Sequence, residues 1–133
     1  ATPAGKGKLG VVPGSMGSPG FIVRGKGNAK SFNSCSHGAG RVMSRAAAFR
    51  TLKHADMKKI LKEQGISLIG GTLDESPEVY KDINKVIDGQ RDLVDVLAKF
   101  EPKLVRMAAE GNQWSNKKKK KKPENKGDED VCM

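Results

Sequence analysis

One histidine in this sequence lies among residues that could carry phosphate chemistry. His37 stands in the segment SCSHGAGR at residues 34–41, within a glycine- and serine-rich stretch over residues 14–45. Glycines let the backbone come close to an anion, and a helix that begins there adds the positive end of its dipole. Arg41 could add a bidentate contact to a phosphate. Because a neutral imidazole can act as a nucleophile or a general base, the stretch predicts a phosphate site with a reactive group inside it.

Two other interpretations of these residues are open. His37 could be a loop histidine whose ring is simply hydrogen-bonded. Cys35 and His37 could instead be two ligands of a metal ion, but one intervening residue fits no common zinc pattern, and no further Cys–His pair lies nearby. The sequence therefore predicts no metal site.

Short apolar runs and turn signals predict the elements that must position this stretch. Strands are expected over residues 9–12, 21–24, 66–69 and 103–107, and helices over residues 41–54, 56–64 and 83–100. The last helix is predicted from apolar residues at helical spacing, with Gln90 as the one exception in the stripe. Residues 1–8 are predicted to be a flexible loop. The expected fold class is α+β, with a mixed sheet and helices.

Charge is unevenly distributed along the 133 residues, whose formal net charge is +10. Residues 1–60 hold eleven lysine and arginine residues and one acidic residue, whereas residues 61–110 are net acidic. This distribution predicts a surface that meets polyphosphate or nucleic acid, or else a solvated basic face. Aromatic residues make up 5% of the chain, too few for a base-stacking platform, so contact with the phosphate backbone of a nucleic acid is favoured over base readout.

Composition also indicates the cellular compartment of the chain and the character of its C-terminal residues. No apolar run approaches the roughly 18 residues of a membrane span, so we expect neither a membrane protein nor an exported one. Two widely separated cysteines, Cys35 and Cys132, fit a reducing compartment. Residues 111–133 contain a run of six lysines and an acidic end, which predicts a disordered lysine-rich tail. The lysines could bind RNA non-specifically or act as a nuclear address, or the tail could be solvated with neither role.

Several motifs occur in the order in which one known family carries them. They are PGSMG at residues 13–17, VRGKGN at 23–28, SCSHGAGR at 34–41 with MSR at 43–45, and YKDI at 80–83, followed by DLVDV at 92–96. Over roughly residues 1–107 the chain resembles the C-terminal third of the RtcB family of RNA-splicing ligases. The resemblance implies that residues 1–110 are the C-terminal portion of an RtcB-like domain, incomplete at its N-terminal side. A start at Ala-Thr-Pro-Ala without methionine agrees with a chain cut from a longer one.

The resemblance implies a reaction for His37. The family joins RNA ends that bear a 3′-phosphate or a 2′,3′-cyclic phosphate to 5′-hydroxyl ends, as in tRNA splicing and RNA repair, with GTP and Mn²⁺. By this resemblance His37 attacks the α-phosphate of GTP, releases pyrophosphate and carries a histidine–GMP phosphoramidate. GMP then passes to the RNA 3′-phosphate, and the 5′-hydroxyl displaces it. The implied partners are RNA, GTP and an accessory activating protein, and the implied location is cytoplasmic, with a nuclear one left open by the lysine run.

The same matching implies a nucleotide-binding site around His37. Its expected members are Pro13, Gly14, Ser15, Met16, Gly38, Ala39, Gly40, Arg41 and Tyr80. Tyr80 is expected to lie against the guanine. The alternative for Tyr80 is a partly buried tyrosine that anchors the start of a helix.

Three departures from the family pattern limit what the resemblance implies. Gly20 stands where many relatives carry a serine that contacts the nucleotide. The family ends in a Lys-Gly whose lysine reaches the guanine, whereas this chain offers only Arg106 as a weak substitute and then continues. The family's manganese ligands lie in upstream segments that this chain does not contain. We therefore expect a ligase part that carries the guanylylated histidine but is inactive alone; the alternative is a non-catalytic basic RNA-binding or interaction protein that retains the scaffold.

Overall fold

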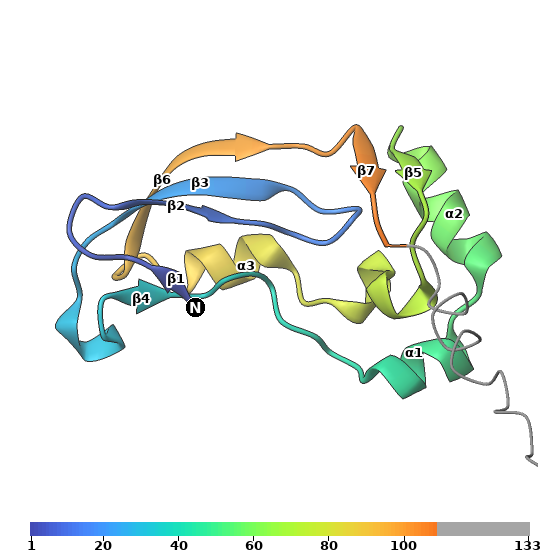
Figure 1. The fold of residues 1–133 in the computed structure, drawn as a ribbon, viewed down its shortest axis with the longest axis horizontal. Coiled ribbons are helices and arrows are strands. Elements are labelled where there is room, and N and C mark those ends of the chain that lie inside the picture. Colours follow the sequence, from blue (N-terminus) through green and yellow to red (C-terminus); the bar gives the residue numbers. More distant parts are fainter. Residues whose placement is uncertain (109–133) are drawn as a thin grey trace, which may run out of the picture.

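The computed structural model describes residues 1–108, which form two lobes (Figure 1). The sheet lobe contains β1 (Thr2–Pro3), β2 (Leu9–Val12), β3 (Gly20–Gly25), β4 (Ser34–Cys35), α3 (Ile83–Asp88) and β6 (Val94–Phe100). The helical lobe contains α1 (Arg45–Thr51), α2 (His54–Glu63), β5 (Ser67–Ile69) and β7 (Leu104–Arg106). Three single-turn 3-10 helices, η1 (Ala29–Ser31), η2 (Leu73–Glu75) and η3 (Pro77–Val79), complete the described elements.

The sheet lobe is built on an antiparallel sheet with the strand order β2-β3-β6. Along β3, Phe21 and Val23 are buried while Ile22 and Arg24 are exposed, which is the alternation of a strand with one covered face. Helix α3 covers that face, and the antiparallel pair β1–β4 lies beside it (Figure 1). The core of this lobe consists of Ala4, Val12, Phe21, Val23, Cys35, Ala39, Ile83, Ile87 and Val94.

The helical lobe has a smaller core of its own. Met57 and Leu61, one turn apart on α2, pack with Met16 and Ile66. Strands β5 and β7 pair in parallel, although 34 residues separate Ile69 from Leu104 in the chain. Because Val12 lies in the first core and Met16 in the second, the short loop between them ties the two lobes together.

The predicted α+β class is confirmed, and so is the strand at residues 9–12. The predicted helix over residues 83–100 is wrong in its second half: α3 ends at Asp88, and residues 94–100 form β6. Gly89 caps the helix, and its N–H group bonds the carbonyls of Lys85 and Ile87. The β-branched Val94 and Val96 then pair with β3, whose open edge satisfies their backbone groups.

Two further predictions need correction. Residues 1–8 are not a flexible loop throughout, because Thr2 and Pro3 pair with β4 and Ala4 is buried, its N–H donating to the Asn33 carbonyl at 2.7 Å. The helix predicted from residue 41 begins at Arg45, where the Ser44 side chain caps it. Helix α1 therefore does not place its N-terminus at His37.

The predicted boundary at residue 110 and the predicted tail over residues 111–133 lie outside the described residues. Within residues 1–108, no helix is both long and apolar enough to cross a membrane.

Candidate functional site

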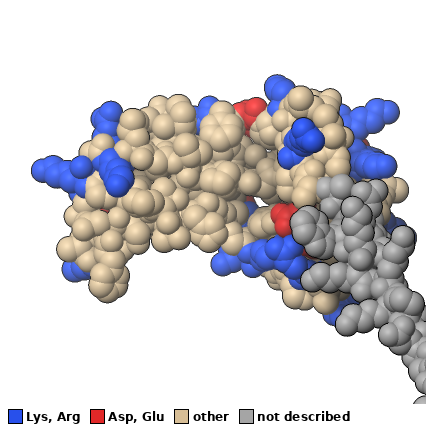
Figure 2. Space-filling view, viewed as in Figure 1, with Lys and Arg blue, Asp and Glu red and all other residues tan. Residues whose placement is uncertain are grey.

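A cavity of about 790 Å³ lies where the two lobes meet. His37 lines it, together with all nine expected nucleotide-binding residues: Pro13, Gly14, Ser15, Met16, Gly38, Ala39, Gly40, Arg41 and Tyr80. These residues come from three segments that are far apart in the sequence. Figure 2 shows the hollow near the middle of the visible face, with lysine, arginine and acidic side chains beside it. The fold thus brings the expected site residues together, while their roles stay predictions.

The loop between β2 and β3 forms one wall. Within it the Ser15 and Ser18 hydroxyls lie 2.8 Å apart, and the Ser18 N–H donates to the Ser15 carbonyl at 3.1 Å. Met16 is buried in the core of the helical lobe. The loop is therefore held both by its own hydrogen bonds and by an apolar anchor, so the backbone that faces the cavity is fixed.

The loop that carries His37 is pinned on both sides of the imidazole. The Ser36 N–H donates to Gln90 Oε1 at 2.6 Å, and Gln90 Nε2 donates to the Val86 carbonyl at 3.1 Å. On the other side, Ala39 is buried in the core of the sheet lobe. His37 itself is exposed. The arrangement presents an accessible imidazole on a backbone with little freedom.

Gln90 is a site residue that sequence reasoning missed. It is 9% exposed and lies just beyond α3, 53 positions from His37 in the chain. The signal was present, because Gln90 interrupts an otherwise apolar stripe. A buried polar side chain in such a stripe needs hydrogen-bond partners, and here one of them is the loop that carries His37.

A short antiparallel contact fixes Arg41 beside Tyr80. The Lys81 N–H donates to the Gly40 carbonyl at 2.9 Å, and the Val42 N–H donates to the Val79 carbonyl at 2.7 Å. Gly40 has a φ of +78°, a conformation that glycine adopts without steric cost. The chain can therefore turn sharply from the His37 loop into this contact.

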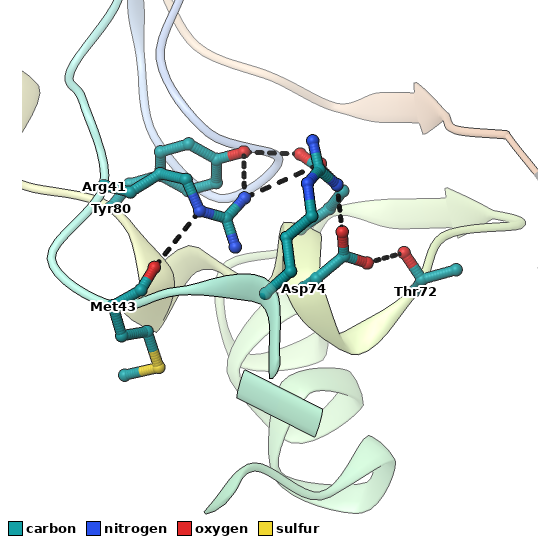
Figure 3. A network of polar contacts seen from close by, with 7 residues as sticks. Arg41, Met43, Thr72, Asp74 and Tyr80 are labelled. Carbon is teal, nitrogen blue, oxygen red and sulfur yellow. Dashed lines mark hydrogen bonds and ion pairs between the residues drawn. The ribbon is translucent and has the colours of Figure 1, made fainter. Parts of the chain in front are cut away.

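Figure 3 shows the polar network that Arg41 and Tyr80 join. The Arg41 guanidinium lies 5.4 Å from the centre of the Tyr80 ring, and its Nε donates to the Met43 carbonyl at 3.2 Å. Its Nη1 lies 3.5 Å from the Tyr80 hydroxyl and 3.9 Å from Glu75 Oε1. Its Nη2 is buried and has no hydrogen-bond partner among residues 1–108. An anion bound in the cavity could accept a hydrogen bond from this unpaired Nη2 group.

The Tyr80 hydroxyl donates to Glu75 Oε2. Burial, with this hydrogen bond as a second cause, raises the pKa of Tyr80 above its ordinary value, so the phenol stays protonated. Tyr80 thus matches both sequence interpretations in part: it is half-buried beside the start of a helical segment, and it also lines the cavity.

A second set of contacts in Figure 3 joins α1 to η2. Arg45 Nη1 donates to Asp74 Oδ2 and lies 3.3 Å from Glu75 Oε1. The Thr72 hydroxyl donates to Asp74 Oδ1. The hydrogen bonds from Thr72 and Arg45 hold the pKa of Asp74 below its ordinary value, although burial alone would raise it.

The described residues do not fit a manganese site. Nowhere in residues 1–108 do three or more His, Cys, Asp or Glu side chains gather so that they could hold a metal ion. Cys35 is buried in the core, and this burial raises the pKa of its thiol. Its Sγ donates to the Ser36 carbonyl at 3.5 Å, so it forms part of the loop's support.

Two basic features of the sequence lie away from this cavity. The VRGKGN motif at residues 23–28 contributes no residue to its lining; Lys26 instead forms an ion pair with Asp95 at 3.3 Å. His54 lines a different cavity of about 830 Å³ between α2 and β5, together with Lys58 and Lys62. We place the candidate site in the cavity of His37, because that cavity gathers all of the expected residues.

Comparison with known proteins gives an independent view of the same residues. The family model "tRNA-splicing ligase RtcB" matches residues 1–108. The "RNA-splicing ligase RtcB" of Escherichia coli (strain K12) is 46% identical over 97 residues, which are 73% of this chain and 24% of that protein. The "tRNA-splicing ligase RtcB" of Nanoarchaeum equitans is 36% identical over 103 residues, covering 71% of this chain and 22% of that protein. The corresponding protein of Archaeoglobus fulgidus is 44% identical over 84 residues, or 59% of this chain and 17% of that protein.

The chain thus spans about a quarter or less of the length of these relatives. The matched residues include the three glycine-rich motifs, at residues 13–17, 23–28 and 34–41, and Tyr80. The resemblance drawn from the motifs is confirmed, and this chain belongs to the RtcB family of tRNA-splicing ligases.

Proposed function

We propose that this chain supplies the nucleotide-binding, histidine-bearing part of a GTP-dependent RNA ligase. The ligase would join RNA ends with a 3′-phosphate or 2′,3′-cyclic phosphate to 5′-hydroxyl ends. One observation carries the proposal: His37 and the nine expected nucleotide-binding residues line a single cavity. Membership of the RtcB family supports an RNA substrate.

The lining of the cavity suits a polyphosphate. Arg41, Arg45, Lys103 and Arg106 contribute four positive side chains, against two acidic ones, Glu75 and Glu101. Glu75 is already engaged by Tyr80 and Arg45, whereas Arg41 keeps one buried donor without a partner. Positive charge in a partly enclosed cavity attracts anions more strongly than the same charge on an open surface.

In the proposed reaction one nitrogen of the His37 imidazole attacks the α-phosphorus of GTP. A nitrogen–phosphorus bond forms, the bond to the bridging oxygen breaks, and pyrophosphate leaves with the electron pair. The other ring nitrogen then releases its proton. An oxygen of the RNA 3′-phosphate next takes GMP and frees His37, and the 5′-hydroxyl finally displaces GMP to close the RNA strand.

This chain's residues have distinct tasks in that sequence. Gln90 and Ala39 hold the backbone on either side of His37, so that the loop presents the imidazole to the cavity from a fixed position. Arg41 stabilises negative charge on the phosphates. Because GMP passes first to His37 and then to the RNA, one difficult transfer is divided into two easier ones. Since the described residues do not fit a manganese site, we assign them no step that involves the metal.

The charge distribution favours a second candidate function, a basic RNA-binding module without catalysis. Eleven lysine and arginine residues against one acid in residues 1–60 are enough for contacts with a phosphate backbone. The two candidates differ in whether His37 is required, since non-catalytic binding places no demand on an imidazole.

A chimera tests the proposal. The matched stretch of the Escherichia coli relative is replaced by residues 1–107 of this chain and incubated with GTP, Mn²⁺ and two RNA fragments, one with a 3′-phosphate and one with a 5′-hydroxyl. We expect joined RNA, its loss in His37→Ala and its retention in His54→Ala. A folded chimera that joins no RNA, or joins it without His37, contradicts the proposal and favours the binding module.

The 133-residue chain alone is expected to join no RNA in the same assay, because residues 1–108 offer no ligand set for manganese. Joined product above the background of a protein-free reaction contradicts this expectation.

A further inference from the structure

The Glu75 carboxylate meets side chains that reach the lining of the His37 cavity from separate segments of the chain. Its Oε2 accepts a hydrogen bond from the Tyr80 hydroxyl, just beyond η3. Its Oε1 lies 3.3 Å from Nη1 of Arg45, the first residue of α1, and 3.9 Å from Nη1 of Arg41, in the loop that follows His37. One carboxylate therefore joins these segments at a wall of the cavity.

The backbone that carries Glu75 is fixed. Glu75 is the last residue of η2, in which Leu73 and Asp74 are buried. Its N–H donates to the Thr72 carbonyl at 3.0 Å, and the N–H of the fully buried Ser76 donates to the Leu73 carbonyl at 3.2 Å. The Glu75 side chain itself is 25% exposed. A carboxylate on such a backbone can orient the longer and more flexible side chains that it contacts.

Arg41 depends on this carboxylate through Tyr80. The Tyr80 ring lies beside the Arg41 guanidinium, 5.4 Å from its centre, and the hydrogen bond to Glu75 limits how far the ring can move (Figure 3). Arg41 Nε donates to the Met43 carbonyl at 3.2 Å, and Nη1 lies 3.5 Å from the Tyr80 hydroxyl. The remaining nitrogen, Nη2, is the buried one without a partner in residues 1–108. The contacts of Tyr80 and Met43 thus leave this donor available to an anion.

Glu75 has two opposite effects on an anion in the cavity. Its negative charge repels the anion directly, which lowers affinity. However, its charge also offsets the repulsion between the guanidinium groups of Arg41 and Arg45, both of which approach Oε1. The Arg45 side chain is 68% exposed and has room to turn away into solvent once that attraction is lost. Because the two effects differ in sign, a binding measurement can decide which one prevails.

We propose that Glu75 is a positioning residue that orients Arg41, through Tyr80, toward the phosphates of a nucleotide bound at His37. This inference rests on the proposed function and extends it to an acidic residue that contacts neither the nucleotide nor the RNA. Glu75 acts on the bound phosphates only through the side chains that it holds. Its positioning effect outweighs the repulsion between its own charge and the anion.

Calorimetric titration of the 133-residue chain with pyrophosphate tests the proposal, because this probe reports phosphate contacts without a base. Glu75→Gln keeps the shape of the side chain and an oxygen for Tyr80, but loses the charge that faces Arg45. We expect affinity for pyrophosphate to fall about ten-fold in this variant, at an unchanged binding stoichiometry. Partial unfolding would instead lower the stoichiometry and leave the dissociation constant of the folded fraction unchanged.

Glu101→Gln is the matched control for charge. Glu101 is the other acidic residue in the lining, but it pairs with Lys99 at 3.1 Å and its side chain is 57% exposed. This variant is expected to bind pyrophosphate as tightly as the wild type or more tightly, because only a repulsive charge is removed. Equal losses in Glu75→Gln and Glu101→Gln overturn the proposal, and so does unchanged or tighter binding by Glu75→Gln.

A second pair of variants tests the path through Tyr80. Tyr80→Phe keeps the ring beside Arg41 but removes the hydroxyl that Glu75 holds, so we expect a loss of about three-fold in affinity for pyrophosphate. The double variant Glu75→Ala/Tyr80→Phe should lose no more than Glu75→Ala alone, because Glu75→Ala already removes the partner of the hydroxyl. Additive losses overturn the path through Tyr80.

The chimera separates this inference from the proposed function. When covalent labelling is measured at increasing GTP, Glu75→Gln is expected to raise KM about ten-fold and to change kcat little, as the loss of a binding contact does. Labelling at His37 with an unchanged KM in Glu75→Gln overturns the positioning role and leaves the proposed function intact. The predicted loss of pyrophosphate affinity supports the positioning role even if the chimera joins no RNA. A wild-type chain that binds no pyrophosphate overturns the positioning role, while labelling of the chimera still decides the proposed function.

Discussion

At the scale of single residues, Gln90 links the end of α3 to the backbone beside His37. Its side chain uses both polar ends: Oε1 accepts from the Ser36 N–H at 2.6 Å, and Nε2 donates to the Val86 carbonyl at 3.1 Å. A buried hydrogen bond of this kind contributes modestly to the free energy of unfolding. Leaving one of its partners unsatisfied lowers that free energy by a larger amount. The position of the imidazole thus depends on an amide that is remote from it in sequence.

Replacing Gln90 tests that dependence. Gln90→Leu leaves the Ser36 N–H without its acceptor, so we expect the free energy of unfolding to fall by about 1–3 kcal/mol in urea denaturation. Gln90→Glu keeps an acceptor for the Ser36 N–H and, when its carboxyl group is protonated, also a donor for the Val86 carbonyl. It should therefore lose less stability than Gln90→Leu at a pH where the carboxyl group is protonated. Equal losses in both variants, or a change below about 0.5 kcal/mol in Gln90→Leu, contradict this role for the side chain.

At the scale of elements, the contact between α1 and η2 depends on one buried carboxylate. Asp74 has a side chain that is 7% exposed, and it accepts hydrogen bonds from Arg45 of α1 and from Thr72. Arg45 also lies in the lining of the His37 cavity. The contact therefore helps to fix one wall of the candidate site.

Acid should weaken this contact in a defined pH range. Because the pKa of Asp74 is held below the 3.8 of an ordinary aspartate, its contribution to stability is complete above pH 3.8 and is lost as the pH falls through the lower folded value. We expect Asp74→Asn to lower the melting temperature by roughly 5 °C at neutral pH. The difference from the wild type should narrow as the pH falls below 3.8.

Asp88→Asn is the matched control, because Asp88 pairs with Arg91 on an exposed surface. Exposed pairs contribute little, so this variant should melt close to the wild type. A gap between wild type and Asp74→Asn that widens in acid contradicts the assignment.

The same scale shows where sequence patterns suffice and where they fail. The strand at residues 9–12 was predictable, because an apolar run ends at a Pro-Gly turn signal. The structure of residues 83–100 was not predictable in this way, because their apolar spacing fits a helix throughout. Residues 94–100 form a strand because they pair with the open edge of β3. The parallel pair β5–β7 also depends on contacts between distant segments, which local patterns do not contain.

The candidate site shows a similar division. The glycine-rich motifs pointed to His37 and Arg41, because these residue types carry recognisable phosphate chemistry. They did not point to Gln90, whose relevance arises from its place just beyond the end of α3, where its side chain reaches the loop that carries His37. Nor did they show that the second glycine-rich motif, at residues 23–28, would lie outside the cavity.

At the scale of the whole molecule, positive charge lies both in the His37 cavity and elsewhere on the surface. Lys58 and Lys62 line the second cavity, beside α2, and Figure 2 shows lysine and arginine side chains at the right of the molecule. Together with the net charge of +10, these groups favour contact with the phosphate backbone of RNA. The few aromatic residues offer little for reading base sequence.

RNA binding by the chain should therefore be weak, indifferent to sequence and strongly dependent on salt. Three phosphate contacts on single-stranded RNA predict roughly a twenty-fold loss of affinity when the salt concentration rises four-fold. Fluorescence anisotropy with two RNAs of unrelated sequence measures this loss, and deletion of residues 111–133 separates the contribution of the lysine run. Affinity that survives the added salt, or that differs strongly between the two RNAs, contradicts the expectation.

The central claim, that His37 is the residue that receives GMP, is tested most directly by covalent labelling. The chimera is incubated with Mn²⁺ and GTP radiolabelled at its α-phosphate, and the wild type is compared with His37→Ala and His54→Ala. The imidazole of His37 lies on the glycine-rich loop of the candidate site, whereas His54 lies at the start of α2 beside a different cavity. We predict protein-bound label that is stable in alkali and labile in acid, as a phosphoramidate requires, that disappears in His37→Ala and that is largely retained in His54→Ala. Label that persists in His37→Ala, or that survives acid, would contradict the assignment of His37 and with it the catalytic role of the cavity.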